Sequence, residues 1–321
     1  ARAAGAEPEQ ILFAGPGKRQ AELEEAIAGG IGEIHVESFE ELHRLEAIGV
    51  ARNRTIAIAL RINPVAAVQG GAMRMGGKPS AFGFDEESLG EVLAAVAACP
   101  HLELVGLHLF AGTQVLDAGV LLGQWEHGLA LAREVSARLG RQLGTVDLGG
   151  GLGIPYFQGD TALDLGVLAA GVPALGRTVP DGTRVVVEPG RFLAGPAGVY
   201  LMAVNAIKRS RGQSFVVTDG GMHHHLAASG NLGQVIKRDY PVIAPTRIDE
   251  PAGPPVSVVG PLCTPLDTLA RCTALPALQV GDLIAVLQSG AYGPTASPGG
   301  FLSHPPASEV LVENHRPALM G

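Results

Sequence analysis

The segment Val185–Arg191, with the sequence VVVEPGR, is the most informative part of this chain. It starts with β-branched residues typical of a buried strand and ends in a carboxylate, a proline, a glycine and an arginine. Parallel α/β barrels keep their functional groups at the C-terminal ends of their strands, and this segment has that form. Since a buried glutamate needs a cationic partner or a bound proton, Glu188 is a candidate functional group.

Strand and helix patterns alternate upstream of this segment. Apolar runs predict strands at 11–14, 34–36, 56–62, 104–110, 145–148 and 184–188. The stretches between them predict helices at 20–28, 39–48, 86–97, 120–139 and 168–175. Such alternation with short links indicates a parallel sheet, either in a (β/α)8 TIM barrel or in a doubly wound α/β fold.

Six strands are two fewer than a closed barrel requires, and an open arc of six leaves two unpaired parallel edges. We therefore expect a (β/α)8 barrel whose first two strands precede the chain as given. After residue 205, short β-type runs at 214–218, 256–259 and 282–287 are separated by Gly, Pro and Asp. This predicts an N-terminally incomplete barrel domain at 1–205 and a β-rich domain at 206–321.

The composition narrows the class of partner. The chain has 321 residues, a net charge of −8 and no long basic block, which argues against nucleic acid. No apolar run reaches the roughly 18 residues of a membrane span. Three scattered cysteines are too few for a disulfide framework or a zinc site. We expect a soluble protein of the reducing cytoplasm.

Three candidate sites lie at the predicted strand ends. The run Gly149–Gly153 is either a loop whose N–H groups approach a phosphate or a plain tight turn. Thr113 either offers its hydroxyl to the same anion or caps a turn. Arg61 is either a surface ion-pair residue or a charge that anchors phosphate or the Glu188 network.

Three further groups lie in the second half of the chain. Cys263 lies among Gly and Pro residues. It is either a small buried apolar residue or a functional thiol. Tyr292 is either a turn aromatic or a hydroxyl that binds phosphate. Adjacent residues of an extended run point to alternate faces, so the three side chains of His223–His225 cannot easily bind one metal ion. We expect this segment to be a loop that faces substrate or solvent.

In this order, the segments 108–113, 149–153, 188–191, 260–267 and 290–292 resemble the fold-type III pyridoxal phosphate (PLP) decarboxylases. That family includes diaminopimelate and ornithine decarboxylases, and the resemblance extends from Ile11 to about Glu309. It implies an alanine-racemase-type barrel followed by a β domain, in homodimers that share their active sites. It also implies pyridoxal 5′-phosphate as cofactor and α-decarboxylation as the reaction.

The resemblance implies roles for individual residues. Glu188 pairs with the pyridine nitrogen and keeps it protonated, so that the ring can accept electrons. Cys263 and Asp267 reach in from the partner subunit, and Cys263 is the candidate acid that protonates the substrate carbon, in competition with the Schiff-base lysine. Arg61 lies near the cofactor. The phosphate is surrounded by Thr113, Gly151, Gly153, Gly190, Arg191 and Tyr292.

The chain departs from the family pattern at several places. The family's Schiff-base lysine lies on the first barrel strand, and Lys18 does not match it. The ring-stacking residue, usually histidine, is Phe110 here, with His108 two residues earlier on the same strand face. Thr264 replaces the carboxylate that holds the distal amino group of a diamino acid in the family.

The loop after Asp219 reads Gly-Met-His-His-His and lacks the family's Arg-Pro form. Its residues His223 and His224, together with Thr264 and Asp267, are the predicted substrate contacts. The pattern is similar to a branch that decarboxylates acidic aminoacyl groups on an acyl carrier protein in natural-product biosynthesis, and to a branch that accompanies exosortase systems. The expected partners are a small-molecule or carrier-bound aminoacyl substrate and a second subunit, without nucleic acid or membrane.

Three alternatives stay open: decarboxylation of a free amino acid such as diaminopimelate, amino-acid racemisation, and a non-catalytic PLP-binding protein. A racemase needs bases on both faces of the α-carbon. Small PLP carriers have the barrel but lack the β domain, so the segments 260–267 and 290–292 argue against that alternative.

Overall fold

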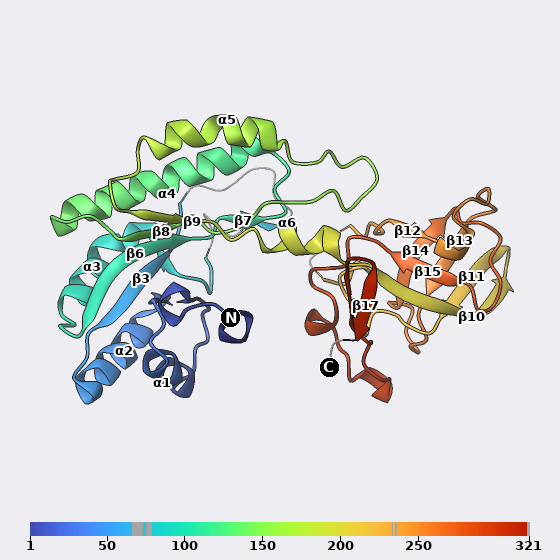
Figure 1. Ribbon diagram of the computed structural model, residues 1–321, viewed down its shortest axis with the longest axis horizontal. Helices are drawn as coiled ribbons and strands as arrows, with labels where there is room; N and C mark the ends of the chain where they lie inside the picture. Colours follow the sequence, from blue (N-terminus) through green and yellow to red (C-terminus); the bar gives the residue numbers. More distant parts are fainter. Residues whose placement is uncertain (66–72, 75–78, 233, 235, 320–321) are drawn as a thin grey trace. The chain divides into compact units, whose positions relative to one another are not determined.

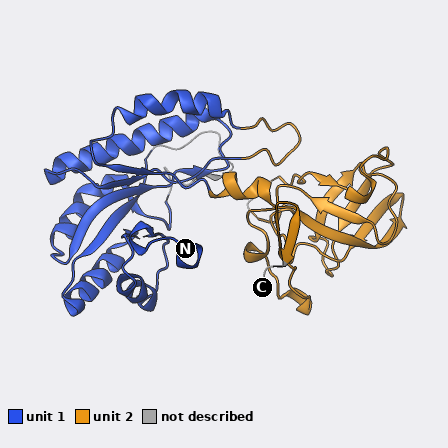
Figure 2. Cartoon of the chain, viewed as in Figure 1, with its two compact units in different colours: residues 1–153, 163–189 blue, residues 154–162, 190–321 orange. Residues whose placement is uncertain are grey.

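The computed structural model describes residues 1–65, 73–74, 79–232, 234 and 236–319. The chain forms two compact units, which Figure 2 shows in different colours. Unit 1 comprises residues 1–153 and 163–189, and unit 2 comprises residues 154–162 and 190–321. Among the described residues, every helix is too short or too polar to span a membrane.

A parallel sheet forms the centre of unit 1 (Figure 1). Six of its strands are adjacent in chain order, and all of the pairs between them are parallel. This confirms the predicted series of six parallel strands in an open half-barrel of α/β type. The strands are β1 (Leu12–Phe13), β2 (Glu33–Val36), β3 (Ile56–Asn63), β6 (Leu102–Leu109), β8 (Thr145–Asp147) and β9 (Arg184–Val186), and β5 (Phe84–Asp85) pairs with the end of β3.

Helices occupy the connections between these strands and bury their apolar faces. The Ser38 hydroxyl accepts the backbone N–H of Glu41 at 3.2 Å, which satisfies a free donor at the start of its helix. Leu23, Leu42 and Leu121 are fully buried helix residues that help to form the core. The helices are α1 (Gln20–Ala28), α2 (Phe39–Arg52), α3 (Leu89–Ala97, after a 3-10 turn at Glu86–Ser88), α4 (Ala118–Leu139) and α5 (Leu165–Gly176).

Unit 2 is built on a six-stranded, mostly antiparallel sheet, which confirms that the second half of the chain is rich in β structure. Its core contains Met202, Val216, Val258 and Leu269. In spatial order the strands are β12 (Val242–Ile243), β15 (Leu283–Val286), β10 (Tyr200–Ser210), β11 (Gln213–Thr218), β13 (Val256–Val259) and β14 (Thr268–Thr273). The unit also contains helix α6 (Gly190–Ala194) and a hairpin of β16 (Val310–Glu313) and β17 (Arg316–Leu319).

The compact units divide at Pro189–Gly190, before the boundary predicted at residue 205. Position 205 falls inside β10, which pairs with β11 and β15 and therefore belongs to unit 2 as a whole. The remaining short elements are the pair β4 (Met73–Arg74) and β7 (Gly112–Thr113), and 3-10 turns at Arg2–Ala4, Pro8–Gln10, Gly195–Ala197, Pro245–Arg247, Pro294–Ala296 and Phe301–Ser303.

Candidate active site

Polar side chains of unit 1 gather at the C-terminal ends of its parallel strands. Arg61, His108 and Asp147 are register partners on β3, β6 and β8. Register partners on neighbouring strands point to the same face of a sheet, so these three side chains lie side by side. All three are buried, as is His35 on β2. Glu188 follows the end of β9, as predicted, and its side chain is 39% exposed.

Two histidines form the inner layer of this group. The rings of His35 and His108 lie against each other with their centroids 4.5 Å apart and their planes tilted by 38°. Burial lowers the pKa of His35 to about 4 and that of His108 to about 2, so both are neutral at pH 7. Their nitrogens and the Asp147 carboxylate lie within 4.8 Å of one another.

Asp147 and Glu188 are neighbouring carboxylates. Nε2 of His108 lies 3.6 Å from Oε1 of Glu188. Oδ1 of Asp147 accepts the backbone N–H of Gly149 at 2.9 Å, while its Oδ2 is buried without a hydrogen-bond partner among the described residues. Burial and the charge of Glu188 raise the pKa of Asp147 to about 7.

The glycine run is needed because strand ends meet there. A β-carbon at Gly149 would lie 2.2 Å from the carbonyl oxygen of Leu109, and one at Gly150 would lie 2.5 Å from that of Glu188. Gly151 has a φ of 100°, a conformation that favours glycine. The N–H of Gly153 donates to the carbonyl of Val115 at 2.9 Å, so this N–H is already used within the loop.

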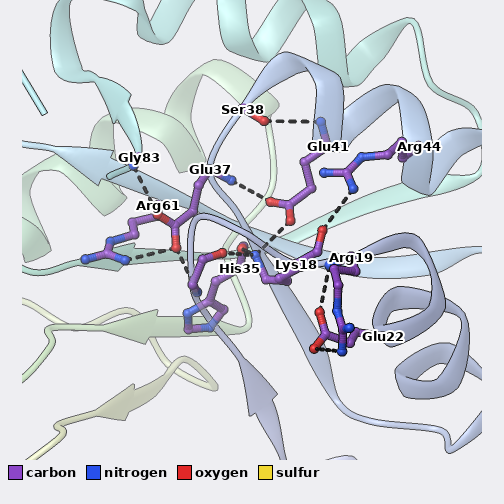
Figure 3. A network of polar contacts seen from close by, with 11 residues as sticks. Lys18, Arg19, Glu22, His35, Glu37, Ser38, Glu41, Arg44, Arg61 and Gly83 are labelled. Atoms are coloured by element: carbon purple, nitrogen blue, oxygen red, sulfur yellow. Dashed lines mark hydrogen bonds and ion pairs between the residues drawn. The ribbon is translucent and has the colours of Figure 1, made fainter. Parts of the chain in front are cut away.

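A buried ion-pair network lies beside this group (Figure 3). Nζ of Lys18 donates to the carbonyls of Gly15 and His35, each at 2.7 Å, and to Glu41 at 2.9 Å. These contacts use all three protons of the ammonium group. Lys18 is therefore a structural cation, which agrees with its mismatch to the Schiff-base lysine of the family.

The same network holds Arg61. Its guanidinium donates to Glu37 at 2.9 Å, and Glu37 also accepts the backbone N–H groups of Gly15 and Gly83. Arg61 is only 8% exposed, so its interpretation as a surface ion-pair residue is wrong. The guanidinium also lies 5.9 Å from the ring centroid of Phe110, which is partly exposed.

Unit 2 brings Arg191 and Tyr292 together. The Arg191 guanidinium lies 4.4 Å from the Tyr292 ring centroid and donates to the hydroxyl of Tyr156 at 3.0 Å. Its Nε is buried and lacks a partner among the described residues. A β-carbon at Gly290 would lie 1.8 Å from the carbonyl oxygen of Ala194, so glycine is required where the Tyr292 loop passes α6.

The predicted substrate contacts separate into exposed and buried residues. Cys263 is exposed, and Thr264 beside it is partly exposed. Asp267 is buried and accepts the backbone N–H groups of Met222 and Leu262 at 2.6 and 3.0 Å, so it joins two loops. These bonds give Asp267 a structural role in unit 2, and its contact with substrate stays a prediction.

The histidines of the neighbouring loop are also held within unit 2. His223 is fully buried between the rings of His224 and His304, at centroid distances of 3.8 and 4.9 Å. Burial lowers its pKa to about 4. His224 lies within hydrogen-bond distance of the Tyr200 hydroxyl, at 3.0 Å, and of the Pro305 carbonyl, at 2.8 Å. Of these two, the partly exposed His224 is the better candidate for a substrate contact.

Sequence reasoning missed four residues of these groups: His35, Glu37, Asp147 and Tyr156. Asp147 is the second-last residue of the predicted strand 145–148, just before the glycine run, and a carboxylate near a strand end is the pattern that identified Glu188. That signal was sufficient to find it. Glu37 gives the same signal, because it directly follows the predicted strand 34–36. His35 and Tyr156 give no comparable signal, because their importance comes from partners that are distant in the chain.

A parallel half-barrel with charged strand ends, followed by a β-rich unit, defines a class of α/β-barrel enzymes. The sequence model described as "Pyridoxal-dependent decarboxylase, pyridoxal binding domain" matches residues 1–195. The chain belongs to this family of pyridoxal-dependent decarboxylases. It is therefore a PLP-dependent carboxy-lyase, with pyridoxal 5′-phosphate as its cofactor.

Individual relatives cover nearly the whole chain. The L-glutamyl-[BtrI acyl-carrier protein] decarboxylase of Niallia circulans is 40% identical over 321 residues, covering 98% of this chain and 75% of that protein. The diaminopimelate decarboxylase of Aquifex aeolicus is 32% identical, covering 98% and 73%. The crystal structure of Helicobacter pylori diaminopimelate decarboxylase complexed with L-lysine matches with a TM-score of 0.87 and 28% identity, covering 99% and 77%.

Each unit, taken by itself, has residues that fit this cofactor. Glu188 offers a half-exposed carboxylate to a ring nitrogen, and the neutral histidines beside it supply no competing positive charge. In unit 2, the Nε of Arg191 is buried and has no hydrogen-bond partner among the described residues. This nitrogen is therefore free to donate to a phosphate group. Phe110 offers a partly exposed aromatic face.

Replacing Arg191 with lysine is expected to weaken PLP binding about 10- to 100-fold. Lysine keeps the charge but loses the planar group that lies against Tyr292 and donates to Tyr156. The measurement is the dissociation constant of PLP, obtained from absorbance titrations of the full-length protein. Arg138→Lys, on the exposed surface of α4, is the matched control. Equal affinity of the two variants would contradict the assignment.

Proposed function

We propose that this protein decarboxylates an acidic aminoacyl group carried on an acyl carrier protein. The observation that carries the proposal is Thr264 in the loop Gly260–Asp267, a hydroxyl at the position where the resemblance to diamino-acid decarboxylases implies a carboxylate. The 40% identity to a decarboxylase whose name specifies a glutamyl group on an acyl carrier protein supports the same substrate class.

The surroundings of this loop also favour an acidic substrate. Nδ2 of Asn231 donates to the carbonyl of Leu266 at 2.9 Å, and Oδ1 of Asn231 accepts Nζ of Lys237 at 2.5 Å. The ammonium group of Lys237 is thus fixed beside the Cys263 loop by an amide rather than by a carboxylate. Its charge stays available for an acidic group.

In the proposed mechanism, bound PLP would supply the ring that accepts the electron pair left on the substrate carbon when CO₂ departs. Glu188 pairs with the ring nitrogen and keeps it protonated. Phe110 is the better ring-stacking candidate, because His108 is buried against His35. Cys263 holds the proton that is delivered to the substrate carbon. Phosphate contacts are proposed for Thr113 and Gly151 in unit 1, and for Gly190, Arg191 and Tyr292 in unit 2. Gly153 is not proposed as a donor to phosphate, because its N–H already donates to Val115.

Replacing Cys263 with alanine is expected to lower the rate of product formation about 100-fold or to change the position of protonation, because the proton donor is lost. The measurement is product formation by the full-length protein in deuterated buffer, with the product analysed by mass spectrometry. Cys272→Ala, another exposed cysteine of unit 2, is the matched control. If both variants keep the wild-type rate and product, Cys263 is not the acid.

We also propose that the protein is a cytoplasmic homodimer with shared active sites and that it acts in natural-product biosynthesis. Family resemblance supports the dimer, and similarity to the carrier-protein decarboxylase supports the biosynthetic setting. Sedimentation of the full-length protein with PLP tests the dimer, and a monomer would contradict it.

The decisive test of the function is CO₂ release by the full-length holoenzyme. The substrates are free diaminopimelate, free glutamate and aspartate, and glutamyl and aspartyl groups linked to an acyl carrier protein. We expect release from a carrier-linked acidic substrate at least tenfold faster than from any free amino acid. Faster release from diaminopimelate would overturn the substrate proposal. Interconversion of single enantiomers without CO₂ would indicate a racemase, and PLP binding with neither reaction would indicate a carrier.

A further inference from the structure

Asp147 and Glu188 lie at the ends of neighbouring strands of unit 1. Asp147 is the register partner of Val186 on β9, and the backbone N–H of Glu188 donates to the carbonyl of Gly149 at 2.9 Å. His108 joins the two carboxylates, because it is the register partner of Asp147 and lies 3.6 Å from Glu188. Asp147 is the buried member of the pair.

The groups around Asp147 do not compensate a second negative charge there. The charged side chains that act on it are Glu188 and Glu33, and both raise its pKa. His108 is neutral because it is buried, and Arg61 is already paired with Glu37. The titratable groups at this end of the sheet are His35 on β2 and Glu37 after it, Arg61 on β3, His108 on β6 and Glu188 after β9. Two further ion pairs are Lys18–Glu41 and Glu33–Arg184, the latter formed by the first residues of β2 and β9.

We propose that Asp147 carries a proton while no cation occupies the site, and that it releases this proton when the cofactor's pyridinium ring pairs with Glu188. A single proton shared by Asp147 and Glu188 prevents repulsion between two adjacent negative charges. A cation bound to Glu188 compensates one of these charges, so the proton is no longer required. The O–H bond of Asp147 breaks, and the proton passes to solvent through the exposed carboxylate of Glu188. The inference rests on the proposed role of Glu188.

The pH window of this exchange follows from the position of Asp147. Its raised pKa, about 7, keeps the carboxyl protonated at pH 6 in the empty site, whereas an ordinary aspartate would be ionised there. Above pH 8 the proton is lost with or without a ligand. Ligand-linked proton release is therefore expected at pH 6 and is expected to disappear at pH 8.5.

The test compares the full-length wild-type protein with Asp147→Asn. Asparagine can still accept the Gly149 N–H and present a neutral donor to Glu188, so the fold is retained. The probe is 4′-deoxypyridoxine 5′-phosphate, which has the ring and phosphate but no aldehyde to react with a lysine. Calorimetric titrations at pH 6.0, in buffers of different ionisation enthalpy, count the protons. Wild type should release about one more proton per site than Asp147→Asn, and Asp164→Asn, at the exposed start of α5, should match wild type.

Two failures are distinguishable. Equal proton release by wild type and Asp147→Asn, with Glu188→Gln still weakening the probe, would overturn the inference and leave the role of Glu188 intact. Unchanged probe affinity in Glu188→Gln would instead contradict the role of Glu188. If Asp147→Asn does not fold, the pKa of the Asp147 carboxyl group is measured instead in the wild-type protein by carbon NMR. Its pKa should fall on addition of the probe, and an unchanged pKa would overturn the inference.

Discussion

Replacing Glu188 with glutamine is expected to slow CO₂ release by the full-length holoenzyme about 100- to 1,000-fold. Glutamine has nearly the same shape but carries no charge, so it cannot stabilise a protonated pyridine nitrogen. Without that proton the ring is a weaker acceptor of the electron pair left behind by CO₂. The backbone bond from Glu188 to Gly149 does not depend on the side chain, so the local fold is expected to persist.

Two measurements make this prediction specific. The dissociation constant of PLP should rise, because the ion pair with the ring is lost, but by a much smaller factor than turnover falls, because the phosphate contacts are retained. Glu126→Gln, on the exposed face of α4, removes the same charge elsewhere and should leave turnover unchanged. Near wild-type turnover in Glu188→Gln would contradict the assignment of Glu188 to the ring nitrogen.

Replacing Lys18 with methionine is expected to lower the free energy of unfolding by about 3–5 kcal/mol. Methionine fills a similar volume but leaves the carboxylate of Glu41 buried without its cation, at a side-chain exposure of 2%. It also leaves the carbonyls of Gly15 and His35 without their shared donor. The measurement is denaturant unfolding of the full-length protein at pH 7.

Matched variants separate the buried pair from a general charge effect. Lys208→Met, on an exposed position of β10, should change the free energy of unfolding by no more than about 0.5 kcal/mol. Lys18→Met combined with Glu41→Gln should recover part of the loss, because no unpaired charge remains buried. If Lys18→Met unfolds at the same denaturant concentration as Lys208→Met, the network does not stabilise unit 1.

The main elements of the fold were predictable because their signals are local. Helix α1 and strand β13 have the predicted bounds, and the other central strands differ by a few residues at their ends. In unit 2, the sequence analysis did not predict β10, β12, β14, β16 and β17, and β10, which runs across position 205, is the longest of these. Its residues alternate little between apolar and polar, and its place in the sheet comes from pairing with β11 and β15.

The candidate site was only partly predictable. Glu188, Arg191 and Asp147 each follow or end a strand in a recognisable pattern, although the pattern at Asp147 was overlooked. Asp267 and His223 were predicted as substrate contacts, but their sequence neighbourhood gives no indication that folding buries them. Only the packed loops reveal that Asp267 accepts two backbone N–H groups across a distance in the chain.

The sequence by itself determined the series of parallel strands, the β-rich second half and the placement of Glu188 at a strand end. These depend on residue periodicity and on turn residues, which act over a few neighbouring positions. Tertiary structure alone decided that Asp147 faces Glu188 and that the ring of His35 lies against that of His108. It also decided that all three protons of the Lys18 ammonium group are used in hydrogen bonds within unit 1. Those contacts depend on lateral strand register and on burial, which arise only when segments distant in the chain pack together.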